Sequence, residues 1–225
     1  MSRISYGLIV ICSSTKRTLV IRRRDSPEII HLLRGFFKRE NLQHLISNRT
    51  ISDDEKLEIL LSGTDLATSL RLCHQLVFPK YPIDDFFQIA LKRISANIDE
   101  IQRLRLLYEP RHETDWLWPK GGTNRDETPI DCAIRETYEE TGIKIPIEYV
   151  LKDEEPLVAD IVTYYNFLCR SYYFIAIVPN EIEACNIPDI DEISKVEWIT
   201  LEEAERRFRS PYRELVPQVS KYLNT

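Results

Sequence analysis

The sequence predicts an α/β protein, an α/β/α sandwich around a mixed sheet, with an all-helical domain inserted into the chain. Strand patterns, rich in β-branched and aromatic residues, occur towards both ends of the sequence, at 6–12, 18–24, 116–118, 157–165, 172–178 and 195–200. Helical patterns accompany the later strands, and the long stretch between the first two strands and the rest carries helical patterns alone. We therefore expect residues 1–26 and 112–225 to form the sandwich and residues 27–111 to form the inserted domain.

The first two strand patterns lie close together. Tyr6–Cys12 and Thr18–Arg24 are apolar and β-branched, and a short turn of Ser, Thr and Lys residues separates them. We expect two buried strands joined by this turn.

The inserted domain is expected to contain several helices. One segment opens at Pro27 and reaches about Ile46, a second is capped by Ser52 and stops near Gly63, and residues 65–77 form a third. Residues 83–107 supply one long helix or two shorter ones. So many apolar residues exclude a disordered linker, because a linker has no core to bury them in.

The C-terminal part of the chain follows with two strand patterns, a last strand at 195–200 and two helices. Thr200 is expected to cap the first helix, and residues 211–223 form an amphipathic second one.

A helix from about Pro129 to Thr141 is the most sharply bounded element. Thr128 is a good N-cap, Pro129 suits the first helical position, and Gly142 lies where a left-handed C-terminal cap is expected. Residues at helical spacing predict its buried stripe: Ile130, Ala133, Ile134, Thr137 and Tyr138.

Three glutamates, Glu136, Glu139 and Glu140, share another side of this helix. Like charges at this spacing repel by roughly 0.2–0.5 kcal/mol per pair on an exposed helix, so a cation is expected beside them. Arg135 alone cannot neutralise them, and hard oxygen ligands suit Mg²⁺ or Mn²⁺. A solvated acidic face is the alternative, and for three glutamates alone it would be the commoner outcome.

The residues around the three glutamates favour a metal site over a solvated acidic face. Gly121, Glu127, Arg135-Glu136, Glu139-Glu140 and Gly142-Ile143 stand at the spacing of the Nudix signature, so the chain resembles the Nudix hydrolases. Thr137 departs from the aliphatic residue that this family prefers. The resemblance implies hydrolysis of a diphosphate linkage with Mg²⁺ or Mn²⁺. It assigns the metal to Glu136, Glu139, Glu140 and the Gly121 carbonyl, and it gives Arg135 and Glu127 the task of orienting the helix.

The general base is left open between Glu140 and a second acid. Residues 191–198 resemble a segment of the mRNA-decapping Nudix enzymes whose loop glutamate contributes to metal binding and proton transfer, and Glu192 is the matching residue. A solvated loop acid is the alternative interpretation.

The approach to the signature also resembles the decapping enzymes, through Trp118-Pro119-Lys120-Gly121. Lys120 is a candidate phosphate ligand and Trp118 a candidate stacking partner for a base, although a tryptophan buried in the core is the commoner case. Gly122 stands where decapping enzymes commonly have Lys, which weakens the inference about substrate.

The whole architecture is most similar to the Nudix decapping proteins of large cytoplasmic DNA viruses. The resemblance implies capped RNA as the substrate and 7-methylguanosine diphosphate as the product. Two alternatives stay open: a small-molecule Nudix hydrolase acting on diphosphoinositol polyphosphates or dinucleoside polyphosphates, and an inactive Nudix binding module.

Basic residues gather at the start of the insert, where Arg34, Lys38 and Arg39 are candidate RNA ligands. Ordinary solvated helix faces are the alternative, and dimerisation through the insert stays open.

The whole composition limits the class of protein. With 36 acidic and 30 basic residues, the net charge of −6 excludes a wholly basic nucleic-acid-coating protein. Five scattered cysteines indicate reduced thiols, and no apolar run has transmembrane length. We expect a soluble, cytoplasmic protein, located in the host cytoplasm if it is viral, with no membrane partner.

Overall fold

The computed structural model describes residues 3–78, 86–112, 115–162, 168–184 and 192–224. The chain forms two compact units, one of residues 1–23 with 115–225 and one of residues 24–114. Within the described residues, all strands belong to the first unit.

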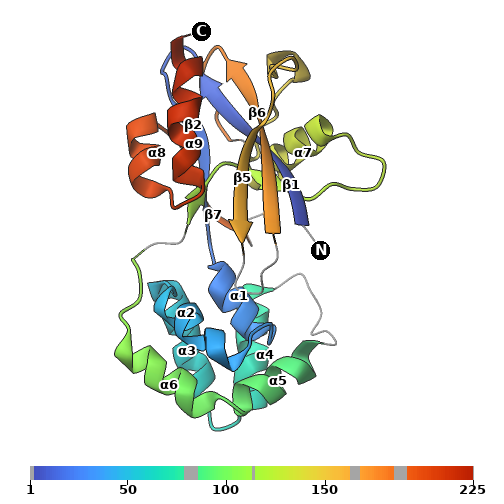
Figure 1. The fold of residues 1–225 in the computed structure, drawn as a ribbon. Helices are drawn as coiled ribbons and strands as arrows, with labels where there is room; N and C mark the ends of the chain where they lie inside the picture. Colours follow the sequence, from blue (N-terminus) through green and yellow to red (C-terminus); the bar gives the residue numbers. More distant parts are fainter. Residues whose placement is uncertain (1–2, 79–85, 113–114, 163–167, 185–191, 225) are drawn as a thin grey trace. The chain divides into compact units, whose positions relative to one another are not determined.

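A mixed sheet organises the first unit (Figure 1). Its central strand β1 (Arg3–Cys12) pairs antiparallel with β2 (Thr18–Arg23) and parallel with β6 (Leu168–Val178), which pairs antiparallel with β5 (Leu157–Val162). The two expected N-terminal strands are therefore confirmed. Of the predicted strand at 157–165, residues 163–165 lie outside the described residues.

Three shorter or later strands complete the sheet. β3 (Trp116–Leu117) and β7 (Ile193–Ile199) both pair antiparallel with β2, and β4 (Lys120–Gly121) pairs antiparallel with β1. Through the β4 pairing, Lys120 and Gly121, which precede the helix Pro129–Thr141, lie opposite Gly7 and Tyr6 of β1.

Helices cover both faces of this sheet. α7 (Pro129–Thr141) lies on one face, and α8 (Leu201–Arg207) and α9 (Tyr212–Val219) lie on the other (Figure 1). Along β1, Leu8 and Val10 pack into the core beneath α7, whereas Ile9 and Ile11 pack into the core beneath α8 and α9. Because successive side chains of a strand point to opposite faces, burial on both faces explains the unbroken apolar run. The predicted α/β/α sandwich is confirmed.

Two 3₁₀ turns, Ile147–Tyr149 and Ser220–Asn224, follow the helices of this unit. Thr200 caps α8 as expected, because its hydroxyl accepts from the Glu203 amide while the Glu203 side chain accepts from the Thr200 amide.

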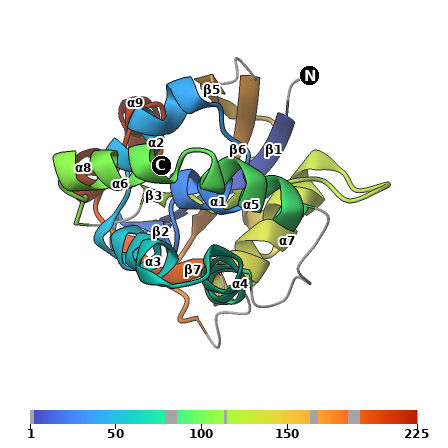
Figure 2. The same cartoon turned by 90° about the horizontal axis from the view of Figure 1, so that it is seen from below.

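The described secondary structure of the second unit is helical, apart from one isolated β-bridge between Thr50 and Arg111. Its elements, in chain order, are α1 (Pro27–Leu33), the 3₁₀ turn Arg39–Asn41, α2 (Leu42–Ser47), α3 (Ile51–Ser62), α4 (Leu66–Val77), α5 (Phe86–Ser95) and α6 (Ile98–Leu107). α3 packs beside α4, and α2 beside α6 (Figure 2). The segment expected at 83–107 is thus two helices.

The first helical segment of this unit is shorter than predicted. Instead of continuing from Pro27 to Ile46, α1 ends at Leu33, and Gly35 adopts the left-handed conformation with φ = 69°. The Gly35 amide donates to the Leu32 carbonyl and the Phe36 amide to the His31 carbonyl, the paired bonds of a Schellman motif. These bonds satisfy the last carbonyls of α1, so the helix stops there.

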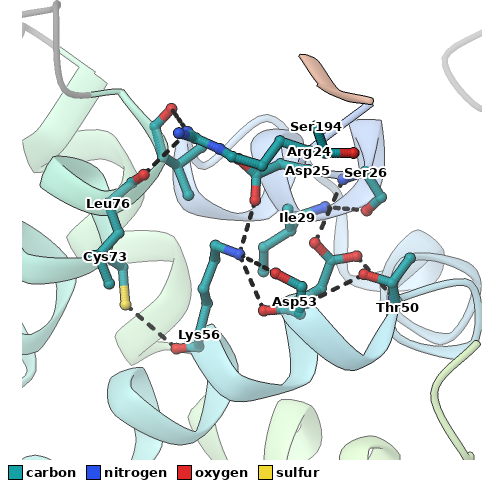
Figure 3. A network of polar contacts seen from close by, with 12 residues as sticks. Arg24, Asp25, Ser26, Ile29, Thr50, Asp53, Lys56, Cys73, Leu76 and Ser194 are labelled. Carbon is teal, nitrogen blue, oxygen red and sulfur yellow. Dashed lines mark hydrogen bonds and ion pairs between the residues drawn. The ribbon is translucent and has the colours of Figure 1, made fainter. Parts of the chain in front are cut away.

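The cap of α3 is also different from the prediction. Thr50, not Ser52, begins the helix, because its hydroxyl accepts from the Asp53 amide and the Asp53 carboxylate accepts from the Thr50 amide (Figure 3). Ser52 instead accepts from Lys56 Nζ at 2.8 Å, and the same ammonium group lies 2.8 Å from Asp25 Oδ1. A buried ion pair therefore joins the start of α1 to α3.

A second ion-pair group links α3 to α6. Asp54 accepts from Arg105 at 2.9 and 2.8 Å and from Arg49 at 2.5 Å. Arg49 is only 2% exposed, so this member of the basic N-terminal part of the insert is a structural residue.

Cys12, Cys73, Cys132 and Cys169 are free thiols, and Cys185 lies outside the described residues. No helix in the described part of the chain is long and apolar enough to cross a membrane.

Candidate active site

α7 begins and ends at the predicted residues. The Thr128 hydroxyl accepts from the Asp131 amide, Pro129 occupies the first turn, and Gly142, at φ = 72°, donates its amide to the Tyr138 carbonyl. Of the expected buried stripe, Ala133 and Thr137 are fully buried, but Tyr138 is 48% exposed, so its inclusion was wrong. Glu140 is buried instead of Tyr138, and its carboxylate points towards the sheet.

Gly121 and Glu136 approach each other closely. A Cβ atom at Gly121 would overlap the Glu136 carboxylate, whereas the same atom at Gly122 would meet nothing within 4 Å. The absence of a side chain at Gly121 therefore lets a half-buried carboxylate of α7 lie against β4. Burial raises the pKa of Glu136, although the hydrogen bond from Arg135 opposes the shift.

Arg135 gathers three carboxylates at one guanidinium group. It contacts both oxygens of Glu127 at 2.8 and 3.0 Å, Glu136 at 2.8 Å and Glu139 at 2.7 Å. Its Nη2 also donates to the Gly122 carbonyl at 2.8 Å. The hydrogen bonds from Arg135 hold the pKa of Glu127 below its usual value. Arg135 and Glu127 therefore fix the loop between β4 and α7 to the helix itself.

Glu140 faces the backbone of β4. Its Oε2 accepts from the Lys120 amide at 2.8 Å. Burial raises the pKa of Glu140, although the charges of Arg23 and Lys120 oppose the shift. Loss of hydration lowers the pKa of the Lys120 amine, and the nearby Arg23 guanidinium lowers it further. Arg23 is thus a positive group at this site, whereas the sequence indicated it only as one of the basic residues around the start of the insert.

The donor set fits a hard divalent cation in its chemistry. The Gly121 carbonyl and the carboxylates of Glu136, Glu139 and Glu140 are hard oxygen donors on two adjoining elements, and the Glu136 carboxylate lies where a side chain at Gly121 would be. Among the described residues, no three His, Cys, Asp or Glu side chains converge closely enough to hold a metal ion as they stand. The carboxylates of Glu136 and Glu139 contact Arg135, and that of Glu140 accepts from the Lys120 amide. Arg135 thus supplies positive charge to Glu136 and Glu139, whereas the nearby positive charges of Glu140 are those of Arg23 and Lys120.

Trp118 does not lie where a substrate base can reach it. It is 0% exposed, its indole N–H donates to Thr18 Oγ1 at 3.0 Å, and its ring packs edge-on against Tyr173 and Phe208. The candidate stacking role of Trp118 is therefore wrong, and the buried core tryptophan, which the sequence left as the alternative, is what the structure contains.

Glu192 lies in the exposed turn directly before β7. The site brings Glu136, Glu139 and Glu140 together on one helix and leaves Glu192 on a separate element. Asp191, which precedes it in the matching segment, lies outside the described residues.

The three candidate RNA ligands lie in the second unit. Lys38 and Arg39 are exposed, and Lys38 lies 3.7 Å from Glu40. Arg34 is half-buried, with its guanidinium 4.4 Å from the centre of the Phe78 ring. Two of the three side chains are therefore at the surface of that unit.

A family model described as the NUDIX domain matches residues 98–219. The mRNA-decapping protein g5R of African swine fever virus (isolate Warthog/Namibia/Wart80/1980) is 33% identical over 223 residues, covering 88% of this chain and 85% of that protein. The mRNA decapping complex subunit 2 of Schizosaccharomyces pombe is 63% identical over 63 residues, 26% of this chain and 8% of that protein.

Two further similarities are more limited. A relative from Acanthamoeba polyphaga mimivirus is 35% identical over 101 residues, and the alignment spans 44% of this chain and only 28% of that relative. The structure of a MutT Nudix hydrolase from Burkholderia pseudomallei has a TM-score of 0.49 and 13% identity, covering 97% of this chain and 98% of that one. Because the family model covers more than half of the sequence and g5R aligns along most of it, this chain belongs to the Nudix family.

Proposed function

We propose that this chain is a divalent-metal-dependent Nudix pyrophosphohydrolase that removes the 7-methylguanosine cap from RNA and releases 7-methylguanosine diphosphate. The observation that carries the proposal is the alignment with g5R, which extends over 88% of the chain and therefore includes the helical unit as well as the Nudix signature. The arrangement of the glutamates of α7 around β4 supports it.

The metal ligands in this proposal are the Gly121 carbonyl and the carboxylates of Glu136, Glu139 and Glu140. When held by these residues, Mg²⁺ or Mn²⁺ would supply positive charge for the phosphate oxygens and would lower the pKa of a bound water. Lys120 adds a further positive charge for a phosphate, next to Arg23. Arg135 and Glu127 act indirectly, by holding the loop and the helix that carry the ligands.

Proton transfer from the attacking water needs a carboxylate that is ionised in the working enzyme. Glu140 and Glu192 are the two candidates. Burial raises the pKa of Glu140, although the charges of Arg23 and Lys120 oppose the shift. Glu192 is exposed and keeps access to water.

The helical unit is proposed to bind the RNA that follows the cap. Lys38 and Arg39 offer exposed charges to phosphates, and the Arg34 guanidinium lies over the ring of Phe78 in the same unit. The cytoplasm is the proposed site of action, in the host cell if the gene is viral. A dimer through the helical unit stays a prediction.

The test is incubation of the purified chain with cap-labelled RNA and Mg²⁺ or Mn²⁺, followed by identification of the released nucleotide. The double variant Glu139→Gln, Glu140→Gln should abolish release, while Glu148→Gln, an exposed glutamate outside α7, serves as the matched control.

The outcomes separate the alternatives. Metal-dependent release of 7-methylguanosine diphosphate that disappears in the double variant supports the proposal. Hydrolysis of diphosphoinositol or dinucleoside polyphosphates without decapping contradicts capped RNA as the substrate but supports hydrolysis of a diphosphate linkage. No hydrolysis of any diphosphate indicates a binding module.

A further inference from the structure

A row of residues crosses the sheet beside the contact between Gly121 and Glu136. In the antiparallel pairing of β1 with β4, Tyr6 lies opposite Gly121, and in the parallel pairing of β1 with β6, Tyr6 lies opposite Tyr172. Residues opposite one another on neighbouring strands point to the same face of a sheet. The Tyr6 and Tyr172 side chains therefore lie on the face towards which the missing Cβ of Gly121 points, which is the face that carries Glu136.

The two tyrosine rings are stacked and reach the surface. Their centroids are 5.6 Å apart with an interplanar angle of 21°, and both side chains are half-buried. Ile4 and Val158, which the strand registers place on the same face, are 44% and 42% exposed. The end of the sheet face that holds the tyrosine row thus opens to solvent beside the glutamates of α7.

The position of the row suits a substrate that contains a base. Neighbouring strands lie about 4.8 Å apart, so Tyr6 is one strand spacing from Gly121 and Tyr172 is two. The distance between a purine and the diphosphate of the same nucleotide is of this order. Tyrosine faces are electron-rich and stack on bases of any sequence, and they attract a positively charged methylated purine more strongly than a neutral one.

We propose that Tyr6 and Tyr172 form the surface on which the purine base of the substrate stacks while its diphosphate lies at Gly121 and Glu136. This inference rests on the proposed function, because it requires a nucleoside diphosphate as substrate or product. It gives the site a contact for the base, a role for which the buried Trp118 is not available.

The experiment measures binding by isothermal titration calorimetry in the presence of Mg²⁺, with 7-methylguanosine diphosphate and with inorganic pyrophosphate, which lacks a base. Tyr6→Leu keeps an apolar side chain and removes the aromatic face. Removal of one stacking partner should weaken nucleotide binding by roughly 5- to 150-fold. Pyrophosphate binding should be unchanged, and Tyr6→Trp should restore nucleotide binding.

Tyr149→Leu is the matched control, because Tyr149 is a half-buried tyrosine that packs against the same core beneath α7. It should bind both ligands like the unmodified chain. Tyr172→Leu repeats the test on the neighbouring ring if Tyr6→Leu fails to fold, as judged by thermal unfolding.

The results distinguish this inference from the proposed function. If Tyr6→Leu and Tyr172→Leu bind the nucleotide normally, or bind pyrophosphate and nucleotide equally weakly, the stacking surface is overturned even though decapping continues. If the unmodified chain does not bind the nucleotide, the surface is overturned too. If the variants fail to bind only the nucleotide but capped RNA is not cleaved by the unmodified chain, the surface stands and the proposed reaction falls.

Discussion

Replacing Gly121 with alanine should separate the chemistry of the site from the stability of the fold. The added Cβ would overlap the carboxylate of Glu136, and real Cβ atoms do not approach other atoms within 3.0 Å. The obstacle is the far end of a flexible side chain, so the backbone can stay in place while the carboxylate retreats by about 1 Å or more. A displacement of this size costs on the order of 10²-fold in rate when it affects a group that positions the reacting atoms.

The assay compares Gly121→Ala with Gly122→Ala, whose Cβ would meet nothing within 4 Å. We expect Gly121→Ala to lower kcat by about 100-fold and to weaken Mn²⁺ binding, measured by calorimetry, with a change in Tm of only a few degrees. Gly122→Ala should match the unmodified chain in kcat, in Mn²⁺ affinity and in Tm. Normal turnover and Mn²⁺ affinity in a folded Gly121→Ala variant would refute the assignment of Glu136 to the metal.

Three further predictions concern separate elements. Glu192→Gln should lower the rate of diphosphate hydrolysis by about 10²–10⁴-fold if its carboxylate transfers the proton, measured under single-turnover conditions. Reversing the charge of Arg34, Lys38 and Arg39 together should weaken RNA binding and lower its salt dependence by about one unit of slope for each phosphate that the variant no longer neutralises. For Asp54, hydrogen bonds from two arginines lower its pKa although burial opposes the shift, so its contribution to stability is present at neutral pH and disappears as the pH falls through that lowered pKa. Asp54→Asn should therefore be less stable at pH 7 in urea unfolding, and the difference should narrow below about pH 4.

Each of these has a control elsewhere on the chain. Glu183→Gln, Lys144→Glu and Asp153→Asn change exposed residues outside the elements concerned. Retained turnover in Glu192→Gln would leave Glu140 as the base. Unchanged RNA affinity at two salt concentrations would contradict the proposal that Arg34, Lys38 and Arg39 bind RNA. A stability difference for Asp54→Asn that stays constant down to about pH 2 would contradict the pKa argument.

Local signals were sufficient for the elements whose ends are fixed by local bonds. Thr128, Pro129 and Gly142 define α7 through contacts within one turn, and the structure has the helix between these residues. Gly35 is a signal of the same kind, but a run of apolar residues at helical spacing continues across the break that its Schellman motif produces, and this run led to the prediction of one long helix. The spacing of side chains does not reveal a turn when both sides of it are buried.

The errors at the site arise from contacts between distant segments. Trp118 is buried because Thr18, Tyr173 and Phe208 surround it, and all three are far from it in the chain. The position of Tyr6 opposite both Gly121 and Tyr172 depends on strand registers that no local pattern specifies. The glutamates, by contrast, could be identified because one helix carries all three.

The pairing of β1 with β6 has a consequence for synthesis of the chain. In this parallel register, each residue of Arg3–Cys12 pairs with a residue of 169–178, so the two members of every pair are 166 residues apart in the sequence. During translation, β1 leaves the ribosome long before its partner exists, while the helices of residues 24–114 can form from nearby contacts. β1 is therefore made before β6 and stays incompletely paired until β6 is made, so its unpaired edge must be kept from other chains until residue 178 has emerged.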